Sequence, residues 1–289
     1  MKNFSRRAFI SKSGMGLTAS VALSGLSFPA FLKNSGIFID QPFGFQTWVV
    51  REMLAKDFPG TLKIMANEGY RLVEMCSPAG YVDSGFEPLT KIKPADMKKI
   101  INDAGLSCPS CHFGFEELTD HLDERIEWSK QIGLSVMVCS SFDLPRTATL
   151  DDYLKSADKL NKAAEKIKKA GMQAGYHNHD MEFHMSDNQL IYDALMKRFD
   201  ADLVKMQFQT QVITLGYKAS DYFNKYPGRF IASHLSDWTA EKKEMPIGQG
   251  IINWKEFFAA AKTGGVKYFY VEMAFATLAP SVSYLKQLS

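Results

Sequence analysis

The sequence predicts a single-domain (β/α)8 barrel, and three observations support this fold class. Short apolar runs alternate with amphipathic helical patterns, eight such runs are present, and no composition break or charge block divides the chain after residue 40. Alternation with short connections implies parallel strands and right-handed crossovers, and eight such units can close a barrel. An open doubly wound sheet would need a glycine-rich phosphate turn after an early strand, and the sequence has none there.

The predicted strands are short apolar segments, each bounded by polar or glycine-containing stretches. In chain order they are Phe43–Trp48, Arg71–Cys76, Ser107–His112, Ser135–Ser140, Gln173–His177, Leu203–Gln209, Arg229–Leu235 and Lys267–Met273.

Helical patterns lie between these strands. The clearest spans Asp151–Ala170, where apolar residues recur on one face and lysine and glutamate occupy the other, and a second spans Leu118–Ile132. Four glycines follow helical patterns and precede strands, where a left-handed C-cap is needed. They are Gly105, Gly133, Gly171 and Gly265.

Residues 1–33 have the features of an export signal and are set apart from the barrel domain, predicted at 37–289. Arg6 and Arg7 form a twin-arginine pattern, and an apolar stretch from Gly14 to Phe31 follows. That stretch is too short and too often interrupted by Gly, Ser and Pro for a stable membrane span. The sequence therefore predicts export by the twin-arginine route to the periplasm.

The charge balance weighs against nucleic acid as a partner. The formal net charge is +2, but residues 1–36 carry five positive charges and no acid, so the chain without them is near −3. Such a protein lacks the broad basic surface that phosphate backbones select.

The four cysteines do not form a dense disulfide framework. Cys108 and Cys111 are three residues apart, so in a strand they face opposite sides. We expect two buried small hydrophobic residues here and neither a redox motif nor a zinc site.

Polar side chains collect near the C-terminal ends of the predicted strands, where barrels of this type build their active sites. Four of the six histidines are among them. Together they are Gln46, Trp48, Glu74, His112, His177, His179, Gln207, Gln209, His234 and Glu272.

Several motifs together resemble the sugar phosphate isomerase/epimerase group of xylose-isomerase-like barrels, through nearly the whole chain after residue 40. They are Phe43-Gly44-Phe45-Gln46-Thr47-Trp48, Tyr176-His177-Asn178-His179-Asp180-Met181-Glu182-Phe183, Tyr226-Pro227-Gly228-Arg229-Phe230 with His234-Leu235-Ser236-Asp237, Ile247-Gly248-Gln249-Gly250 with Trp254, and Val271-Glu272-Met273. The resemblance implies a divalent metal held by one ligand each from strands 5, 6, 7 and 8, usually Glu, Asp, His and Glu. It also implies carboxylates that flank the substrate as acid and base.

This sequence departs from that ligand pattern in its first two members. His234 and Glu272 match the last two ligands, but His177 stands where Glu is common, and Gln207 or Gln209 stands where Asp is common. The predicted metal set is thus His177, Gln209, His234 and Glu272. The lower negative charge disfavours Mg²⁺ and favours Zn²⁺, Mn²⁺ or Fe²⁺. Glu182 could loop back towards this site.

The chemistry shared by such sites is removal of a proton α to a carbonyl. Imidazole suits the base without much tuning, so we predict His177 or His179 as base, with Glu272 as ligand or second acid/base group.

The predicted substrate contacts come from five other residues. Gln46, Glu74, His112 and Gln207 would bind hydroxyl groups, and Trp48 would offer an apolar face to a sugar ring or simply pack at the barrel mouth.

The outcome of proton abstraction stays open between isomerisation or epimerisation and a lyase or hydratase reaction on a keto-sugar or keto-glycoside. A third alternative is a non-catalytic sugar-binding barrel. An abasic-site endonuclease, the other well-known user of this barrel, would need more metal ligands and a basic face. Because sugar phosphates are scarce outside the cytoplasm, we expect an unphosphorylated sugar, keto-sugar or glycoside.

Overall fold

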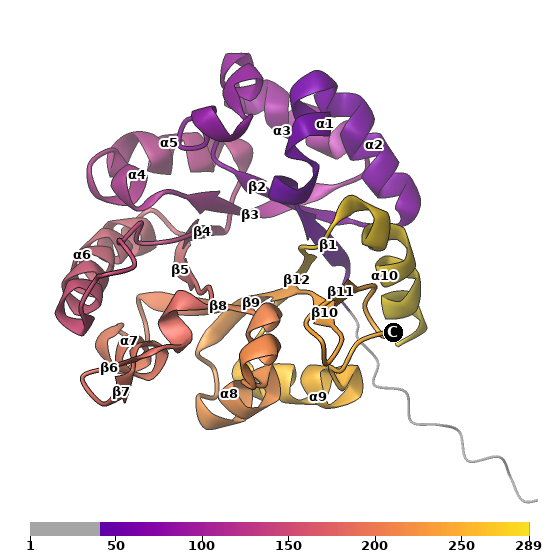
Figure 1. Ribbon diagram of the computed structural model, residues 1–289. Coiled ribbons are helices and arrows are strands. Elements are labelled where there is room, and N and C mark those ends of the chain that lie inside the picture. The colour runs from indigo at the N-terminus through magenta and orange to yellow at the C-terminus, as the bar shows by residue number, and fades with distance from the viewer. Residues whose placement is uncertain (1–40, 289) are drawn as a thin grey trace, which may run out of the picture. The chain divides into compact units, whose positions relative to one another are not determined.

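The computed structural model describes residues 41–288, which form a closed barrel of eight parallel strands surrounded by helices (Figure 1). Each strand pairs with its neighbours in chain order, and the last strand pairs with the first to close the barrel. The barrel strands are β1 (Phe43–Gln46), β2 (Leu72–Cys76), β3 (Ser107–Phe113), β4 (Val136–Cys139), β5 (Gln173–His177), β8 (Val204–Gln209), β9 (Phe230–Leu235) and β12 (Tyr268–Val271). The predicted (β/α)8 fold is confirmed.

Ten α-helices are described in residues 41–288, and they cover the outside of the barrel (Figure 1). They are α1 (Arg51–Lys56), α2 (Phe58–Glu68), α3 (Pro94–Asp103), α4 (Phe115–Thr119), α5 (Leu122–Ile132), α6 (Leu150–Lys169), α7 (Ile191–Arg198), α8 (Ala219–Lys225), α9 (Trp254–Gly264) and α10 (Phe275–Gln287). Two small antiparallel pairs, β6 (Met185–Ser186) with β7 (Gln189–Leu190) and β10 (Asp237–Trp238) with β11 (Glu244–Met245), lie in the loops. None of the described helices has the length and apolar character needed to cross a membrane.

The first predicted strand ends two residues earlier than the sequence indicates, and the reason is a side-chain cap. The Oε1 atom of Gln46 accepts a hydrogen bond from the backbone N–H of Trp48 at 3.0 Å. This bond begins the 3-10 turn Thr47–Val50, which displaces the chain from the strand direction. Trp48 therefore stands on the turn and not on β1.

The predicted helix at Leu118–Ile132 is two helices, since α4 ends at Thr119 and α5 begins at Leu122. The longest predicted helix is confirmed as α6, shifted by one residue at each end. Its start is fixed by a capping box, in which the Thr149 hydroxyl and the Asp152 carboxylate cap each other's backbone N–H groups.

The four predicted C-cap glycines all adopt left-handed backbone conformations. Their φ angles are 80° at Gly105, 89° at Gly133, 85° at Gly171 and 85° at Gly265. A side chain at these positions would be strained, so each glycine lets the chain leave a helix and enter the next strand directly.

The barrel interior is apolar below the site. Leu72, Val136, Val138, Ile231 and Ala232 form a buried cluster with Tyr270. Leu72 shares a strand face with Glu74, and Ala232 shares one with His234, because side chains alternate along a strand. The polar site therefore rests on a packed apolar plug.

All four cysteines are free, and Cys76, Cys111 and Cys139 are buried. Cys108 is only half-buried, so the expectation of two buried residues in this pair holds for Cys111 alone. The predicted signal segment, residues 1–33, lies outside the described residues, and its export role stays a prediction.

Candidate active site

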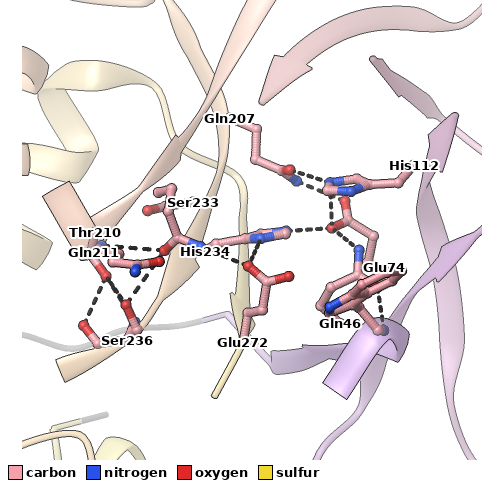
Figure 2. Close-up of polar contacts among 12 residues, drawn as sticks. Gln46, Glu74, His112, Gln207, Thr210, Gln211, Ser233, His234, Ser236 and Glu272 are labelled. Carbon is pink, nitrogen blue, oxygen red and sulfur yellow. Dashed lines mark hydrogen bonds and ion pairs between the residues drawn. The ribbon is translucent and has the colours of Figure 1, made fainter. Parts of the chain in front are cut away.

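A buried carboxylate on β2 organises the lower part of the site. Glu74 is completely buried and accepts hydrogen bonds from side chains on four other strands. Figure 2 shows Glu74 with three of these partners, Gln46, Gln207 and His234. The donors are Gln46 Nε2 at 2.9 Å, Ser110 Oγ at 2.5 Å, Gln207 Nε2 at 2.7 Å and His234 Nε2 at 2.5 Å. We call Gln46, Glu74, Ser110, Gln207 and His234 the floor of the site.

His234 is held between two carboxylates (Figure 2). Its Nε2 contacts Glu74, and its Nδ1 lies 2.9 Å from the Oε2 atom of Glu272. The same Glu272 oxygen accepts a hydrogen bond from Gln209 Nε2 at 2.6 Å. Glu272 is therefore fixed by a neighbour on each of two strands, while its side chain remains about 20% exposed.

These contacts set the charges of the site. Burial alone would lower the pKa of His234, but Glu272 and Glu74 together raise it to about 10. Burial likewise raises the pKa of Glu74, but His112 and His234 outweigh this and lower it to about 2. The pKa of Glu272 is lowered, because His234 outweighs the effect of burial there too. At neutral pH an imidazolium thus lies between two carboxylates.

His112 and His177 differ from His234 in their protonation state. Burial lowers the pKa of His112, and it lowers the pKa of His177 further, to well below the ordinary value, with the neighbouring imidazoles acting in the same direction. The His177 ring centroid lies 5.0 Å from that of His112 and 4.4 Å from that of His234. Both His112 and His177 are therefore neutral at physiological pH, the state in which an imidazole can bind a metal ion.

A cavity of about 270 Å³ opens above this cluster. Five of the predicted site residues line it, namely Trp48, His112, His177, His179 and Glu272. Five further residues complete its wall, namely Cys76, Tyr81, Ser140, Ser141 and Asp143. Sequence reasoning missed these five; the signal available was that Ser140, Ser141 and Asp143 follow the end of β4, at the same face of the barrel as the other site residues.

Three residues expected to bind substrate hydroxyls have a different position. Gln46, Glu74 and Gln207 are completely buried and do not line the cavity. Their polar atoms are occupied by one another and by the imidazoles, for example at 2.6 Å between Gln207 Oε1 and His112 Nε2. The structure therefore places these three residues in the floor, beneath the cavity, and their contact with substrate stays a prediction.

Gln209, expected among the metal ligands, also has other partners. Besides its bond to Glu272, its Oε1 atom accepts from the backbone N–H of Gln211 at 3.3 Å, which caps the turn Thr210–Leu215. In this geometry Gln209 positions Glu272.

Glu182 does not loop back towards the cluster. Its carboxylate accepts hydrogen bonds from the Tyr176 hydroxyl at 2.6 Å and from the backbone N–H of His179 at 2.8 Å. His179 lies two residues beyond the end of β5, so Glu182 fixes the loop that carries this histidine over the cavity.

The loop around Gly248 surrounds a second buried carboxylate, that of Asp237. Asp237 accepts from the backbone N–H groups of Gly248 and Gly250 and from Trp254 Nε1, at 2.9, 3.1 and 2.8 Å. A Cβ atom at Gly250 would lie 2.1 Å from Asp237 Oδ1, so only glycine fits. Asp237 does not line the cavity.

Comparison with known proteins agrees with this architecture. The model of the family described as "Xylose isomerase-like TIM barrel" matches residues 62–287. The chain belongs to this family.

Solved structures of the family's fold resemble it closely. A sugar phosphate isomerase/epimerase from Parabacteroides distasonis ATCC 8503 has 26% identity and a TM-score of 0.74, over 90% of this chain and 98% of that one. An L-ribulose 3-epimerase has 14% identity and a TM-score of 0.64, over 86% and 94%. The IolI protein with a bound zinc atom has 14% identity and a TM-score of 0.64, over 86% and 96%. No curated protein sequence matches the chain.

The imidazole cluster has the chemistry of a divalent metal site. His112, His177 and His234 each offer one ring nitrogen, and these atoms lie within 4.8 Å of one another. The Nδ1 atom of His177 is buried without a hydrogen-bond partner among the described residues. Three imidazoles, each unprotonated at the nitrogen that binds, are a donor set that suits Zn²⁺ and similar ions. His234 would have to lose its proton and its contact with one carboxylate to bind an ion, whereas the Nδ1 atom of His177 has no partner among the described residues.

Proposed function

We propose that this barrel is a sugar isomerase or epimerase-type enzyme that removes a proton α to the carbonyl of a sugar or keto-sugar. The single observation that carries the proposal is the placement of neutral imidazoles and a fixed carboxylate, Glu272, around one cavity at the C-terminal end of the barrel. The similar structures include a sugar phosphate isomerase/epimerase and an L-ribulose 3-epimerase, and these support the same class.

We assign the proton abstraction to His179. Both His177 and His179 line the cavity, but His177 belongs to the buried three-histidine cluster, which leaves His179 as the imidazole outside it. Glu182 holds the backbone of His179, so the ring is presented from a fixed loop.

Glu272 would be the second acid/base group. It lines the cavity on the β12 side, and β12 and β5 are three strands apart in the eight-stranded barrel, so the two groups face the substrate from well-separated directions. The hydrogen bonds from His234 and Gln209 keep the Glu272 carboxylate ionised and in one orientation.

We further propose that His112, His177 and His234 hold one divalent ion, with Zn²⁺, Mn²⁺ or Fe²⁺ favoured over Mg²⁺ because the donors are nitrogen atoms. Such an ion would supply Lewis-acid stabilisation of negative charge on a carbonyl oxygen. Elemental analysis should find about one ion per chain, lost in His177→Ala and His234→Ala but kept in the control His121→Ala, whose side chain lies outside the cluster. Full turnover in the presence of chelator, by protein shown to be metal-free, would contradict this.

The experiment that tests the reaction is incubation with keto-sugars in D₂O, followed by proton NMR. We expect loss of the signal from the proton α to the carbonyl, and no loss with a His179→Gln, Glu272→Gln double variant. An epimer or isomer as product supports the proposed class, whereas an eliminated or hydrated product indicates a lyase or hydratase. Binding of the same sugars with no exchange would overturn the enzymatic assignment and leave a sugar-binding barrel.

We also propose periplasmic export through the twin-arginine segment. Replacement of both Arg6 and Arg7 by lysine should retain the protein in the cytoplasm, as measured by cell fractionation. Undiminished export of that variant would contradict the twin-arginine route.

A further inference from the structure

Apart from the histidines, the charged side chains that line the cavity are all negative. Glu272 and Asp143 contribute carboxylates, and neither lysine nor arginine is among the ten lining residues. Lysine, arginine and helix N-termini are common ways in which enzymes bind the phosphate group of a substrate. Lys and Arg make up 34 residues of this chain, so their absence from the cavity wall is informative.

Two arginines lie within three residues of the lining in the sequence, and neither supplies the missing charge. Arg51 stacks its guanidinium 4.5 Å above the Trp48 ring and donates from Nη1 to the Trp48 carbonyl at 2.8 Å. Arg146 is exposed on the loop after β4 and does not line the cavity.

Asp143 is held in place by its own loop. Its φ angle is 53°, in the left-handed region that aspartate tolerates better than most residues. Its backbone N–H donates to the Ser141 hydroxyl oxygen at 2.9 Å, so the turn that carries the carboxylate is closed on itself. Ser141 also lines the cavity, which keeps this turn at the cavity wall.

We propose that the cavity selects an uncharged sugar and rejects its phosphate ester, and that Asp143 is the specificity-determining residue. The inference rests on the proposed function, because it names the substrate class of the same site. A phosphate dianion in the cavity would meet the carboxylates of Glu272 and Asp143 with no lysine or arginine in the wall to balance them, whereas hydroxyl groups can donate to those same carboxylates. Trp48 and Tyr81, whose ring centroids are 6.1 Å apart, add aromatic surface suited to the C–H faces of a sugar.

The test compares matched pairs that differ only in the phosphate, namely D-ribulose with D-ribulose 5-phosphate and D-fructose with D-fructose 6-phosphate. Binding is measured by calorimetry and deuterium exchange by NMR. We expect the neutral member of a pair to bind and exchange at least about tenfold better. Asp143→Ser should reduce this difference between the neutral sugar and its phosphate ester severalfold, and Asp143→Lys should reduce the difference further. A rise in ionic strength should also reduce the preference of the unaltered protein for the neutral sugar.

Asp187→Ser is the matched control, because Asp187 is also an exposed aspartate with a positive φ angle, 49°, but does not line the cavity. It should leave the preference unchanged. Inorganic phosphate is a second probe: it should not perturb the His177 and His179 ring signals in the unaltered protein.

The outcomes separate this inference from the proposed function. Neutral sugars that bind better but do not exchange would support the selectivity and overturn the enzymatic assignment. Phosphate esters that bind and exchange better, with no effect of Asp143→Ser, would overturn the selectivity and leave the enzymatic assignment standing. Submillimolar binding of inorganic phosphate to the cavity histidines would also overturn the selectivity.

Discussion

The floor of the site and the upper wall of the cavity differ in how they are built. The floor side chains come from strands, are completely buried and satisfy one another's hydrogen bonds. The upper wall, which we call the rim and define as Trp48, Tyr81, Asp143 and His179, comes from turns after the strands and is partly exposed. In the proposed function, the floor would set the charge of the reacting groups and the rim would contact the substrate.

The largest effect is expected at the rim, where His179 is assigned as base. His179→Gln should lower kcat about 10²–10⁴-fold, because general acid/base groups contribute that much, while the free energy of unfolding stays nearly unchanged. The measurement is deuterium exchange at saturating sugar, with His184→Gln as control, since His184 is exposed and does not line the cavity. Near-normal exchange in His179→Gln, with a large loss in His177→Gln, would move the base to the buried cluster.

A substitution in the floor should lower the free energy of unfolding as well as the reaction rate. Glu74→Gln keeps the shape of the side chain but removes the charge that pairs with His234 and His112. Loss of one partner from such a buried network typically costs about 3–5 kcal/mol in the free energy of unfolding. Urea denaturation measures this, and Glu87→Gln, at an exposed ion pair with Lys91, should cost less than about 1 kcal/mol. A stable, fully active Glu74→Gln protein would remove the distinction between floor and rim.

The same floor predicts how stability depends on pH. The pKa of Glu74 is lowered from 4.5 to about 2, so its contribution is complete above about pH 4.5 and is lost as the pH falls towards 2. The pKa of His234 is raised from 6.5 to about 10, so its contribution is complete below about pH 6.5 and is lost as the pH rises through 10. Unfolding curves from pH 2 to 10 should show both losses, and Glu74→Gln should weaken both. If the free energy of unfolding falls with the same slope at acid pH in the variant, then other carboxylates cause most of that loss of stability.

The division between floor and rim also explains what the sequence could predict. The eight strands follow from apolar runs, and the four C-cap glycines follow from their position between helix and strand, because both signals are local. That Glu74 pairs with His234, 160 residues away, depends on the register around the closed barrel. Residue type and strand position therefore indicated the site, but not that Gln46, Glu74 and Gln207 lie below its surface.

The rim was harder still, because its residues stand on turns. Asp143 follows a strand for which the sequence indicated no site residue, and Tyr81 lies five residues beyond the end of β2. No periodic pattern places such turn residues over a cavity. Trp48 was found from its motif, but its place on a turn depends on the Gln46 cap.

The smallest predicted effect, and the one that most directly probes the rim as a binding surface, is at Trp48. The ring is 37% exposed, lines the cavity, and is held by the Arg51 guanidinium on one side and by an edge contact with Tyr81. The ring offers a large apolar face and one N–H donor but no group that transfers a proton, so we expect it to stabilise the bound sugar equally in the ground state and the transition state. Trp48→Ala should therefore raise KM about 3–10-fold with kcat nearly unchanged, and Trp48→Phe should recover much of that loss. Arg51→Met is the comparison variant for these kinetics, because it keeps much of the side-chain bulk but loses the cation–π contact with Trp48. An equal fall in kcat and kcat/KM for Trp48→Ala would show that the ring acts only in the transition state. Trp48 would then contribute to the chemistry and not only to substrate binding, and the division between rim and floor would fail at this residue.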